Sequence, residues 1–204
     1  MLTSCEIKIL EQLIQKPLEA QSINQLAQKI KLAYPHVYHS VQELEKRELL
    51  DITTTGRSSL CRVRFDHPEL LAIASMETSQ GFLSKYLHIN NLFHQLTEEL
   101  SAELYIALIF GSYAKGKATK KSDIDLFFIV QEKSKIEAFK NKINSVLNKL
   151  NYKVDFEVST LDWFYEMLGE KNTVGREIFE SSIILHNAEA YFYVVRKYVQ
   201  RKGY

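Results

Sequence analysis

Apolar and polar positions in the first third of the chain follow first the helical period and then the strand period. Leu10, Leu13 and Ile14 recur at helical spacing, and Pro17 ends the helix that they predict. The elements expected here are this first helix, helices over 23–30 and from Pro35, and strands over 49–53 and 60–65. Residues 1–66 are therefore expected to form one small domain of three helices followed by a hairpin.

The rest of the chain predicts a helical connection and then a mixture of strands and amphipathic helices. The helical pattern continues from residue 67 to residue 101, with a break expected at Ser79-Gln80-Gly81. Beyond it, strands are expected over 105–110, 126–130, 153–158 and 182–186, and helices over 135–150, 161–168, 176–180 and 188–201. We assign residues 67–81 to the connection and 82–204 to a second domain. The predicted fold class is α+β, in which the second, α/β domain contains a small mixed sheet.

The composition is that of an ordinary folded protein. Hydrophobic residues make up 46% and charged residues 25% of the 204 positions, which argues against disorder. Lys and Arg number 26 against 25 Asp and Glu, so the net charge does not demand a nucleic-acid partner. Two cysteines, Cys5 and Cys61, are too few for a disulfide framework or a zinc site, and we expect a cytoplasmic protein with both reduced. No signal peptide and no apolar run of about 20 residues is visible, so no membrane contact is expected.

The most specific chemistry lies in a turn between two apolar runs. Residues 111–116 have the sequence Gly-Ser-Tyr-Ala-Lys-Gly, and a lysine-rich loop follows them. Asp123 and Asp125 are then two residues apart, so on a strand both carboxylates would leave the same face. Carboxylates held this close repel each other, and a divalent cation such as Mg²⁺ or Mn²⁺ relieves the repulsion. Since the glycine-serine turn offers backbone N–H groups to an anion, the segment predicts an anion site beside a metal site, as nucleotide chemistry requires.

This segment resembles the signature of the nucleotidyltransferase superfamily that includes DNA polymerase β. Gly111-Ser112 followed by Asp123-x-Asp125 carries the resemblance, which extends over residues 82–200. The fuller string is similar to the minimal nucleotidyltransferase branch, whose small domains are often encoded beside a helical toxin-like partner. That branch usually has arginine where Lys115 stands, and lysine keeps the charge but loses bidentate phosphate binding.

The resemblance implies which residues form the site. Two Mg²⁺ ions, or Mn²⁺, would be held by Asp123 and Asp125 together with a third carboxylate on a later strand. We choose Asp155 because it follows a helix and a Lys-Val lead-in, and Glu157 on the same strand face is the alternative. The residues implied to bind the phosphates of a nucleoside triphosphate, expected to be ATP, are Gly111, Ser112, Lys115 and Ser122.

A second resemblance concerns the N-terminal domain. Three helices and a hairpin in this order look like a winged helix-turn-helix, and residues 37–50 are similar to the recognition helix and wing entry of MarR- or ArsR-like regulators, which usually have glycine where Glu48 stands. In that fold the start of the third helix enters the major groove of double-stranded DNA. The residues implied to contact DNA are Tyr34, His36, His39 and Ser40 on the helix and Arg57 at the wing tip. The helix face offers few cations, so a winged helix used for dimerisation or protein contact stays an alternative.

These features lead to two hypotheses for the function. The first is a Mg²⁺-dependent nucleotidyltransferase, coupled to an antitoxin-like DNA-binding domain, that moves a nucleoside monophosphate onto an acceptor hydroxyl. The acceptor could be a protein tyrosine, an RNA 3′ end or a small molecule, and the minimal branch most readily implies a partner protein. The second is a DNA-binding transcriptional regulator whose nucleotidyltransferase-like domain only senses nucleotide. Since winged-helix regulators commonly bind two half-sites, we expect a homodimer.

Overall fold

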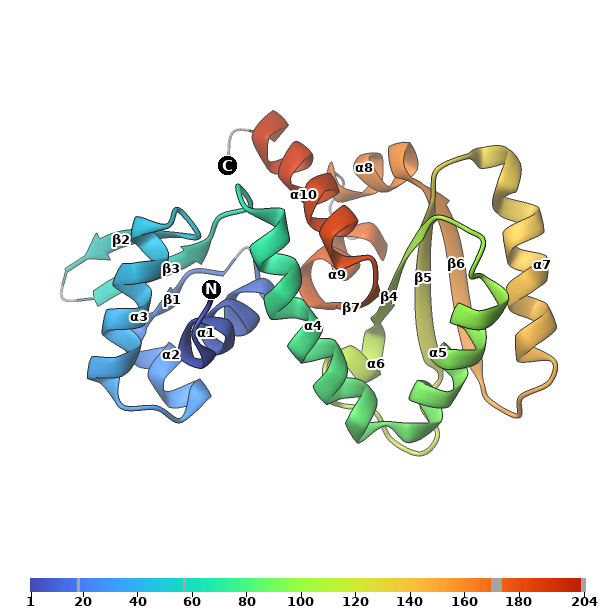
Figure 1. The fold of residues 1–204 in the computed structure, drawn as a ribbon, viewed down its shortest axis with the longest axis horizontal. Helices are drawn as coiled ribbons and strands as arrows, with labels where there is room; N and C mark the ends of the chain where they lie inside the picture. Colours follow the sequence, from blue (N-terminus) through green and yellow to red (C-terminus); the bar gives the residue numbers. More distant parts are fainter. Residues whose placement is uncertain (18, 57, 170–173, 203–204) are drawn as a thin grey trace. The chain divides into compact units, whose positions relative to one another are not determined.

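The computed structural model describes residues 1–17, 19–56, 58–169 and 174–202 (Figure 1). The chain divides into two units, of which the first contains Met1–Met76 and Glu189–Tyr204 and the second contains Glu77–Ala188. The division between residues 76 and 77 falls inside the connection predicted over 67–81. The prediction and the structure differ at the C-terminal end, because residues 189–204 group with the N-terminal unit and not with the second domain predicted over 82–204.

The first unit begins with the topology of a winged helix. In chain order it contains α1 (Ser4–Ile14), β1 (Gln21–Ser22), α2 (Ile23–Ile30), α3 (Tyr34–Lys46), β2 (Leu50–Thr55) and β3 (Ser58–Val63). The strands form an antiparallel sheet in the order β1-β3-β2, so β2 and β3 are the hairpin of the wing. The predicted winged helix-turn-helix is thereby confirmed. Strand β1 was not predicted, because two residues are too few to show a period.

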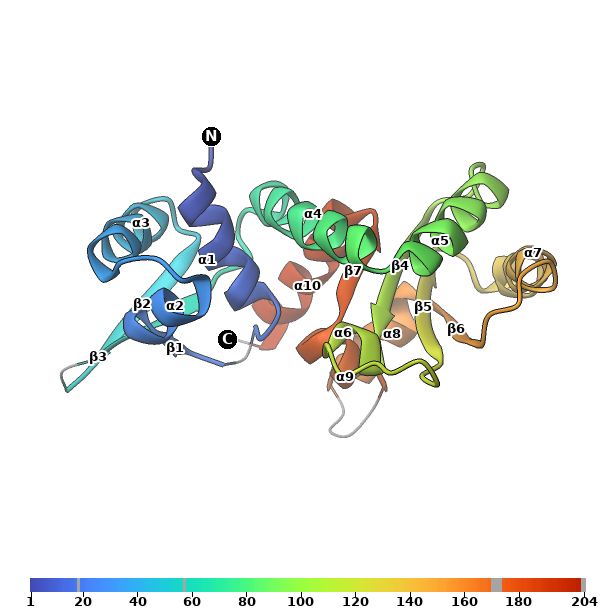
Figure 2. The same cartoon turned by 90° about the horizontal axis from the view of Figure 1, so that it is seen from below.

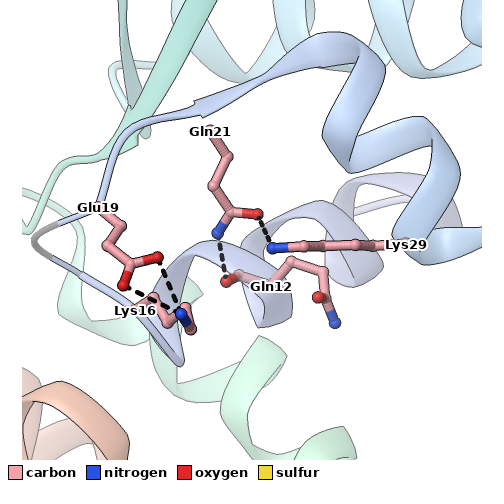
Figure 3. Close-up of polar contacts among 5 residues, drawn as sticks. All are labelled: Gln12, Lys16, Glu19, Gln21 and Lys29. Carbon is pink, nitrogen blue, oxygen red and sulfur yellow. Dashed lines mark hydrogen bonds and ion pairs between the residues drawn. The ribbon is translucent and has the colours of Figure 1, made fainter.

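Polar side chains at the edge of the apolar core stabilise helices α1 and α2 of the winged helix. Thr3 and Ser22 form capping boxes at the starts of α1 and α2. Figure 3 shows Gln21, only 3% exposed, between these helices. Its Nε2 donates to the carbonyl oxygen of Gln12 at 3.0 Å, and Lys29 Nζ donates to its Oε1 at 2.7 Å. Both ends of this buried amide are therefore satisfied, as burial of a polar group requires.

Three longer helices remain, of which the first crosses the division between the units and the last begins at it. They are α4 (Pro68–Lys85), α5 (Leu87–Glu99) and α10 (Ala188–Lys202). The break expected at residues 79–81 is wrong, because α4 continues through Gly81 and the helices separate at Tyr86. In α10, the buried Phe192 stacks with Phe65 at a centroid distance of 6.4 Å, which is one contact that joins this helix to the first unit. Among the described helices, none is long and apolar enough to cross a membrane.

The second unit contains the mixed sheet that the sequence predicted. Its strands are β4 (Tyr105–Phe110), β5 (Ile124–Val130), β6 (Val154–Thr160) and β7 (Ile183–His186), and its other elements are α6 (Gly111–Ala114), η1 (Lys133–Lys135), α7 (Ile136–Leu147), α8 (Leu161–Gly169) and α9 (Val174–Ser181). The strand order is β6-β5-β4-β7. Strands β5 and β6 are parallel, whereas β4 is antiparallel to both β5 and β7. The parallel pair is joined through α7, as a parallel connection requires a crossover.

The two faces of this sheet have different neighbours. Leu126 and Phe128 of β5 lie in the apolar core with residues of α5 and α7, including Phe139. Phe127 points to the opposite face, where its ring lies 5.8 Å from that of Phe164 in α8. Figure 2 shows α8 and α9 on the side of the sheet away from α5 and α7. Asp125 shares the strand face of Phe127, so the candidate site lies on the side of α8 and α9.

Candidate active site

Gly111 begins the turn that follows β4, and its backbone lies directly against a candidate metal ligand. Its φ of 67° is in the left-handed region, which favours glycine. A Cβ at this position would be 2.0 Å from Asp125 Oδ2, so no larger residue fits without a shift. Phe110, the last residue of β4, pairs with Asp125 across the antiparallel ladder. Strand pairing and the bare glycine together hold the Asp125 carboxylate beside the turn.

The other predicted phosphate-binding residues lie in or after α6. No side chain in the described structure caps the start of α6, which contains Ser112. Lys115 follows this short helix, and its backbone N–H donates to the carbonyl oxygen of Gly111 at 3.2 Å. Ser122 lies at the end of the lysine-rich loop, where its Oγ accepts a hydrogen bond from the backbone N–H of Thr119 at 2.9 Å. Ser122 therefore orders the loop, whereas Ser112 and Lys115 belong to the turn itself.

Register brings two of the three predicted carboxylates together. Asp125 of β5 pairs with Asp155 of β6 in the parallel ladder, so both side chains leave the same face of the sheet. Asp123 lies one residue before β5, and its carboxylate is 3.9 Å from Lys153 Nζ. Asp125 and Asp155 therefore share a strand face, and Asp123 lies just before β5 in the sequence.

The same register distinguishes the two candidates for the third carboxylate. Both Asp155 and Glu157 are exposed on β6, which is an edge strand. Asp155 lies opposite Asp125, whereas Glu157 lies opposite the fully buried Phe127. The geometry therefore favours Asp155 as the partner of Asp125.

The electrostatics of the site centre on Asp125. Its pKa is raised above the ordinary value, first because the carboxylate is partly desolvated and then because Asp155, Asp123 and Glu177 lie nearby. Lys115 opposes this shift. The carboxylates therefore repel one another in the nucleotide-free protein, which is the condition that a bound cation would relieve.

Sequence reasoning missed Glu177. This residue of α9 accepts a hydrogen bond from Lys115, with 2.7 Å between Oε1 and Nζ. It is 62 positions from Lys115 in the sequence, and nothing in the local pattern of α9 distinguishes it from an ordinary surface glutamate. Only the tertiary fold, which packs α9 beside α6 and β4, shows that it belongs to the site.

The fit of a divalent metal rests on the chemistry of these donors. In the described part of the chain, no three His, Cys, Asp or Glu side chains converge closely enough to be a ready-made metal site. Asp125 and Asp155 nevertheless supply hard oxygen donors at one register position, and the pKa of Asp125 is raised by desolvation and then by the charge of Asp155. The donor type and charge fit Mg²⁺ or Mn²⁺, and Asp123, which lies close enough to act on Asp125, would be the third carboxylate ligand.

Tyr113 of the turn is buried under aromatic residues and covers the turn from the core side. Its hydroxyl lies 3.1 Å from His88 Nε2, and its ring packs edge-on against Tyr86 at 5.2 Å. Burial and Tyr86 raise the pKa of the Tyr113 phenol above its usual range. The phenol is therefore a neutral structural group at physiological pH.

The residues predicted to contact DNA gather on α3, with one exception. Tyr34, His36 and His39 are exposed and Ser40 is half-buried, while Arg57 lies outside the described residues. Sequence reasoning did not include Tyr38, which is 40% exposed and stacks on Tyr34 at a centroid distance of 6.0 Å. The helical spacing of Tyr34 and Tyr38 could have shown that they share a face.

Comparison with known proteins assigns the sheet-containing unit. The family model for polymerase beta nucleotidyltransferases matches residues 90–189. This part of the chain is therefore a nucleotidyltransferase domain of the polymerase β family, as its motif indicated. No curated protein sequence matches the chain.

Solved structures resemble separate parts of the chain at low scores. A mutant of ZitR from Lactococcus lactis is 21% identical over 45% of this chain and 62% of its own, with a TM-score of 0.35. A protein from Sulfolobus solfataricus described provisionally as a nucleotidyltransferase is 21% identical over 54% of this chain and 84% of its own, with a TM-score of 0.32. A toxin–antitoxin structure with AMP-PNP is 16% identical over 54% and 89%, with a TM-score of 0.33. Because all three TM-scores are below 0.5, no conclusion about the site is drawn from these structures.

Proposed function

We propose that this protein is a Mg²⁺-dependent nucleotidyltransferase that moves a nucleoside monophosphate from a nucleoside triphosphate, expected to be ATP, to an acceptor hydroxyl. One observation carries the proposal. Asp125 and Asp155 share a register position on parallel strands, while the backbone of Gly111 lies against the Asp125 carboxylate. Carboxylates beside a glycine-serine turn are what a site for a metal-bound triphosphate needs.

In this proposal each residue has a defined role. Asp123, Asp125 and Asp155 hold the Mg²⁺ ions, which neutralise the triphosphate when bound. Ser112 and Lys115 orient the β- and γ-phosphates. The acceptor oxygen forms a bond to the α-phosphorus, the bond from that phosphorus to the β-phosphate bridging oxygen breaks, and pyrophosphate leaves. The proton of the acceptor hydroxyl passes to the Asp155 carboxylate.

The winged helix adds a second part to the proposal. Its exposed α3 residues, Tyr34, His36 and His39, suit the reading of a major groove in double-stranded DNA. A protein that modifies a partner and binds DNA would act as an antitoxin-like regulator, and a partner-protein hydroxyl is the acceptor that we favour. We propose that it binds DNA as a homodimer.

The test is a transfer experiment with its own negative control. Wild type and Asp123→Ala are incubated with Mg²⁺, α-phosphate-labelled ATP and an extract of the source cells. We expect label on a macromolecule with wild type only, and the labelled band then identifies the acceptor class.

The rival proposal is a DNA-binding regulator that only senses nucleotide. It predicts that wild type binds Mg²⁺-ATP without forming any labelled product, and that Asp123→Ala weakens this binding. Nucleotide binding without transfer would therefore replace the transferase proposal with the sensor.

A further inference from the structure

The one lysine of the Gly-Ser-Tyr-Ala-Lys-Gly turn is already bound to a carboxylate. Lys115 Nζ lies 2.7 Å from Glu177 Oε1, a distance typical of a charge-assisted hydrogen bond. The side chains of Lys115 and Glu177 are 41% and 40% exposed, so water and ions reach the pair. A phosphate that used this ammonium would have to share it with Glu177 or displace Glu177.

The charges around the pair oppose the binding of any anion that is not itself neutralised. Asp155, Asp123 and Glu177 all lie near Asp125, because its pKa is raised first by desolvation and then by the charges of these three carboxylates. Two ammonium groups pair with carboxylates here: Lys115 with Glu177, and Lys153 with Asp123 at 3.9 Å. An approaching phosphate therefore meets several carboxylates beside these two paired ammonium groups, while Lys117, Lys120 and Lys121 are exposed in the loop that follows the turn.

We propose that Glu177 is a further residue of the nucleotide site, where its carboxylate competes with phosphate for the ammonium of Lys115. This inference rests on the proposed nucleotide-binding function. Because exposed ion pairs are weak, a highly charged polyphosphate can take the ammonium from a single carboxylate. A weakly charged phosphate competes less well, so Glu177 disfavours monophosphates and inorganic phosphate relative to a triphosphate.

Glu177 could instead position Lys115 for phosphate, and this alternative predicts the opposite result. If the carboxylate holds the ammonium where phosphate needs it, removal of its charge weakens binding. If the carboxylate competes, removal of its charge strengthens binding. The sign of one measured change therefore decides between the two roles.

The experiment measures binding of Mg²⁺-ATP and of tripolyphosphate to the full chain by calorimetry. Wild type, Glu177→Gln, Lys115→Gln and the double variant form a double-mutant cycle. We expect Glu177→Gln to lower the Kd for both ligands by roughly three- to tenfold, because the variant has no carboxylate to compete for Lys115 or to repel the phosphates. In the Lys115→Gln background the same change should have a clearly smaller effect.

A matched control lies on the same helix. Glu180 of α9 forms an ion pair with Arg176, and the change Glu180→Gln removes the same charge from the same helix. We expect it to leave the Kd for tripolyphosphate within about twofold of wild type, because Glu180 pairs with Arg176 and solvent screens an exposed charge.

The outcomes separate this inference from the proposed function. Weaker or unchanged binding by Glu177→Gln, or an equal effect in the Lys115→Gln background, would overturn the competing role while transfer by wild type still supports the transferase. Tighter binding without any transfer would support the competing role and count against the transferase. If neither wild type nor Glu177→Gln binds ATP or tripolyphosphate, both proposals are wrong.

Discussion

The two units hold their candidate functional residues in different ways. On the winged helix, the exposed face of α3 carries Tyr34 and His39, while Val37 and Val41 on the other side of the same helix are fully buried. In the nucleotidyltransferase domain, Asp125 is held between a neighbouring strand and the backbone of Gly111. On α3, therefore, different side chains serve binding and folding. At Asp125, the same residue belongs to the candidate site and to the packing of the fold.

The difference predicts how substitutions behave in each unit. A side chain on the exposed face of α3 can be shortened without a cavity, because the core lies behind it. A change at the turn of β4 and α6 alters a backbone conformation, a strand pair and a group of like charges together. Function and stability should therefore change independently in the winged helix and jointly in the nucleotidyltransferase domain.

The largest expected effect compares two acids of one strand. Asp155→Asn should lower the rate of nucleotide transfer roughly 100-fold or more, because it removes one charged ligand from the site. Glu157→Gln makes the same chemical change two residues along, opposite Phe127 instead of Asp125. It should alter the rate less than about threefold. Initial rates of label transfer measure both effects. A larger loss of rate in Glu157→Gln than in Asp155→Asn would identify Glu157 as the third carboxylate of the site.

The next effect compares two glycines with the same backbone conformation. Gly111 and Gly116 both have a φ of 67°, but only at Gly111 would a Cβ collide with another residue. We expect Gly116→Ala to destabilise the fold by about 1 kcal/mol from backbone strain alone. Gly111→Ala should cost about 2–4 kcal/mol, because the displaced Asp125 adds overpacking to the strain. Urea denaturation at pH 7 measures both, and equal losses would mean that the contact with Asp125 is not tight.

The sequence predicted those parts of the site that depend on local pattern. The Gly-Ser turn and Asp125 lie next to apolar strands, and their spacing indicated an anion site beside a metal site, whereas the family resemblance implied the third carboxylate, Asp155. Glu177 could not be found in this way, because its contact with Lys115 depends on how α9 packs in three dimensions. The strand expected over 126–130 begins two residues earlier, at Ile124, and so includes Asp125, since strand ends are set by ladder hydrogen bonds and not by composition alone.

The fold was predicted in the same uneven way. The winged helix and the mixed sheet followed from periodicity, and most elements lie within a few residues of their predicted positions. The sequence predicts a break at Gly81, but this residue lies inside α4, and a Cβ built on it would have no other atom within 4 Å. The cost of a helical glycine, about 1 kcal/mol, is small compared with the helix around it. One contact that joins α10 to the first unit, between Phe65 and Phe192, connects residues that are far apart in the sequence.

A smaller effect is expected on the exposed face of α3. Tyr34→Ala should weaken specific DNA binding by about 1–2 kcal/mol, roughly 5- to 30-fold, and leave unfolding by urea nearly unchanged. Tyr193 of α10 is exposed to a similar extent, 46% against 45%, so Tyr193→Ala controls for the loss of any exposed tyrosine. Fluorescence anisotropy with DNA from the protein's own operon measures both. Equal loss of binding in the two variants would contradict the assignment of α3 as the reading helix.

The smallest effect concerns the like charges around Asp125 and their dependence on pH. Since the pKa of Asp125 is raised in the folded protein, the folded state binds this proton more tightly than the unfolded chain. Its contribution to stability is therefore lost as pH rises from the ordinary carboxyl value through the raised one. Asp125→Asn has no such proton. Without Mg²⁺, its free energy of unfolding should therefore rise relative to that of wild type between pH 3 and pH 7. The rise should be less than about 1 kcal/mol, because solvent screens the site.

Glu103 provides a control of opposite sign for this prediction. Its pKa is lowered because Lys142 donates a hydrogen bond to its carboxylate. The stability that this pair contributes is present above the ordinary carboxyl pKa and is lost as the pH falls through the lowered value. Glu103→Gln should therefore be less stable than wild type at pH 7 and approach it at pH 3. Urea denaturation of the three proteins at both pH values measures these differences, and parallel shifts in the two variants would show that the charges around Asp125 do not strain the fold.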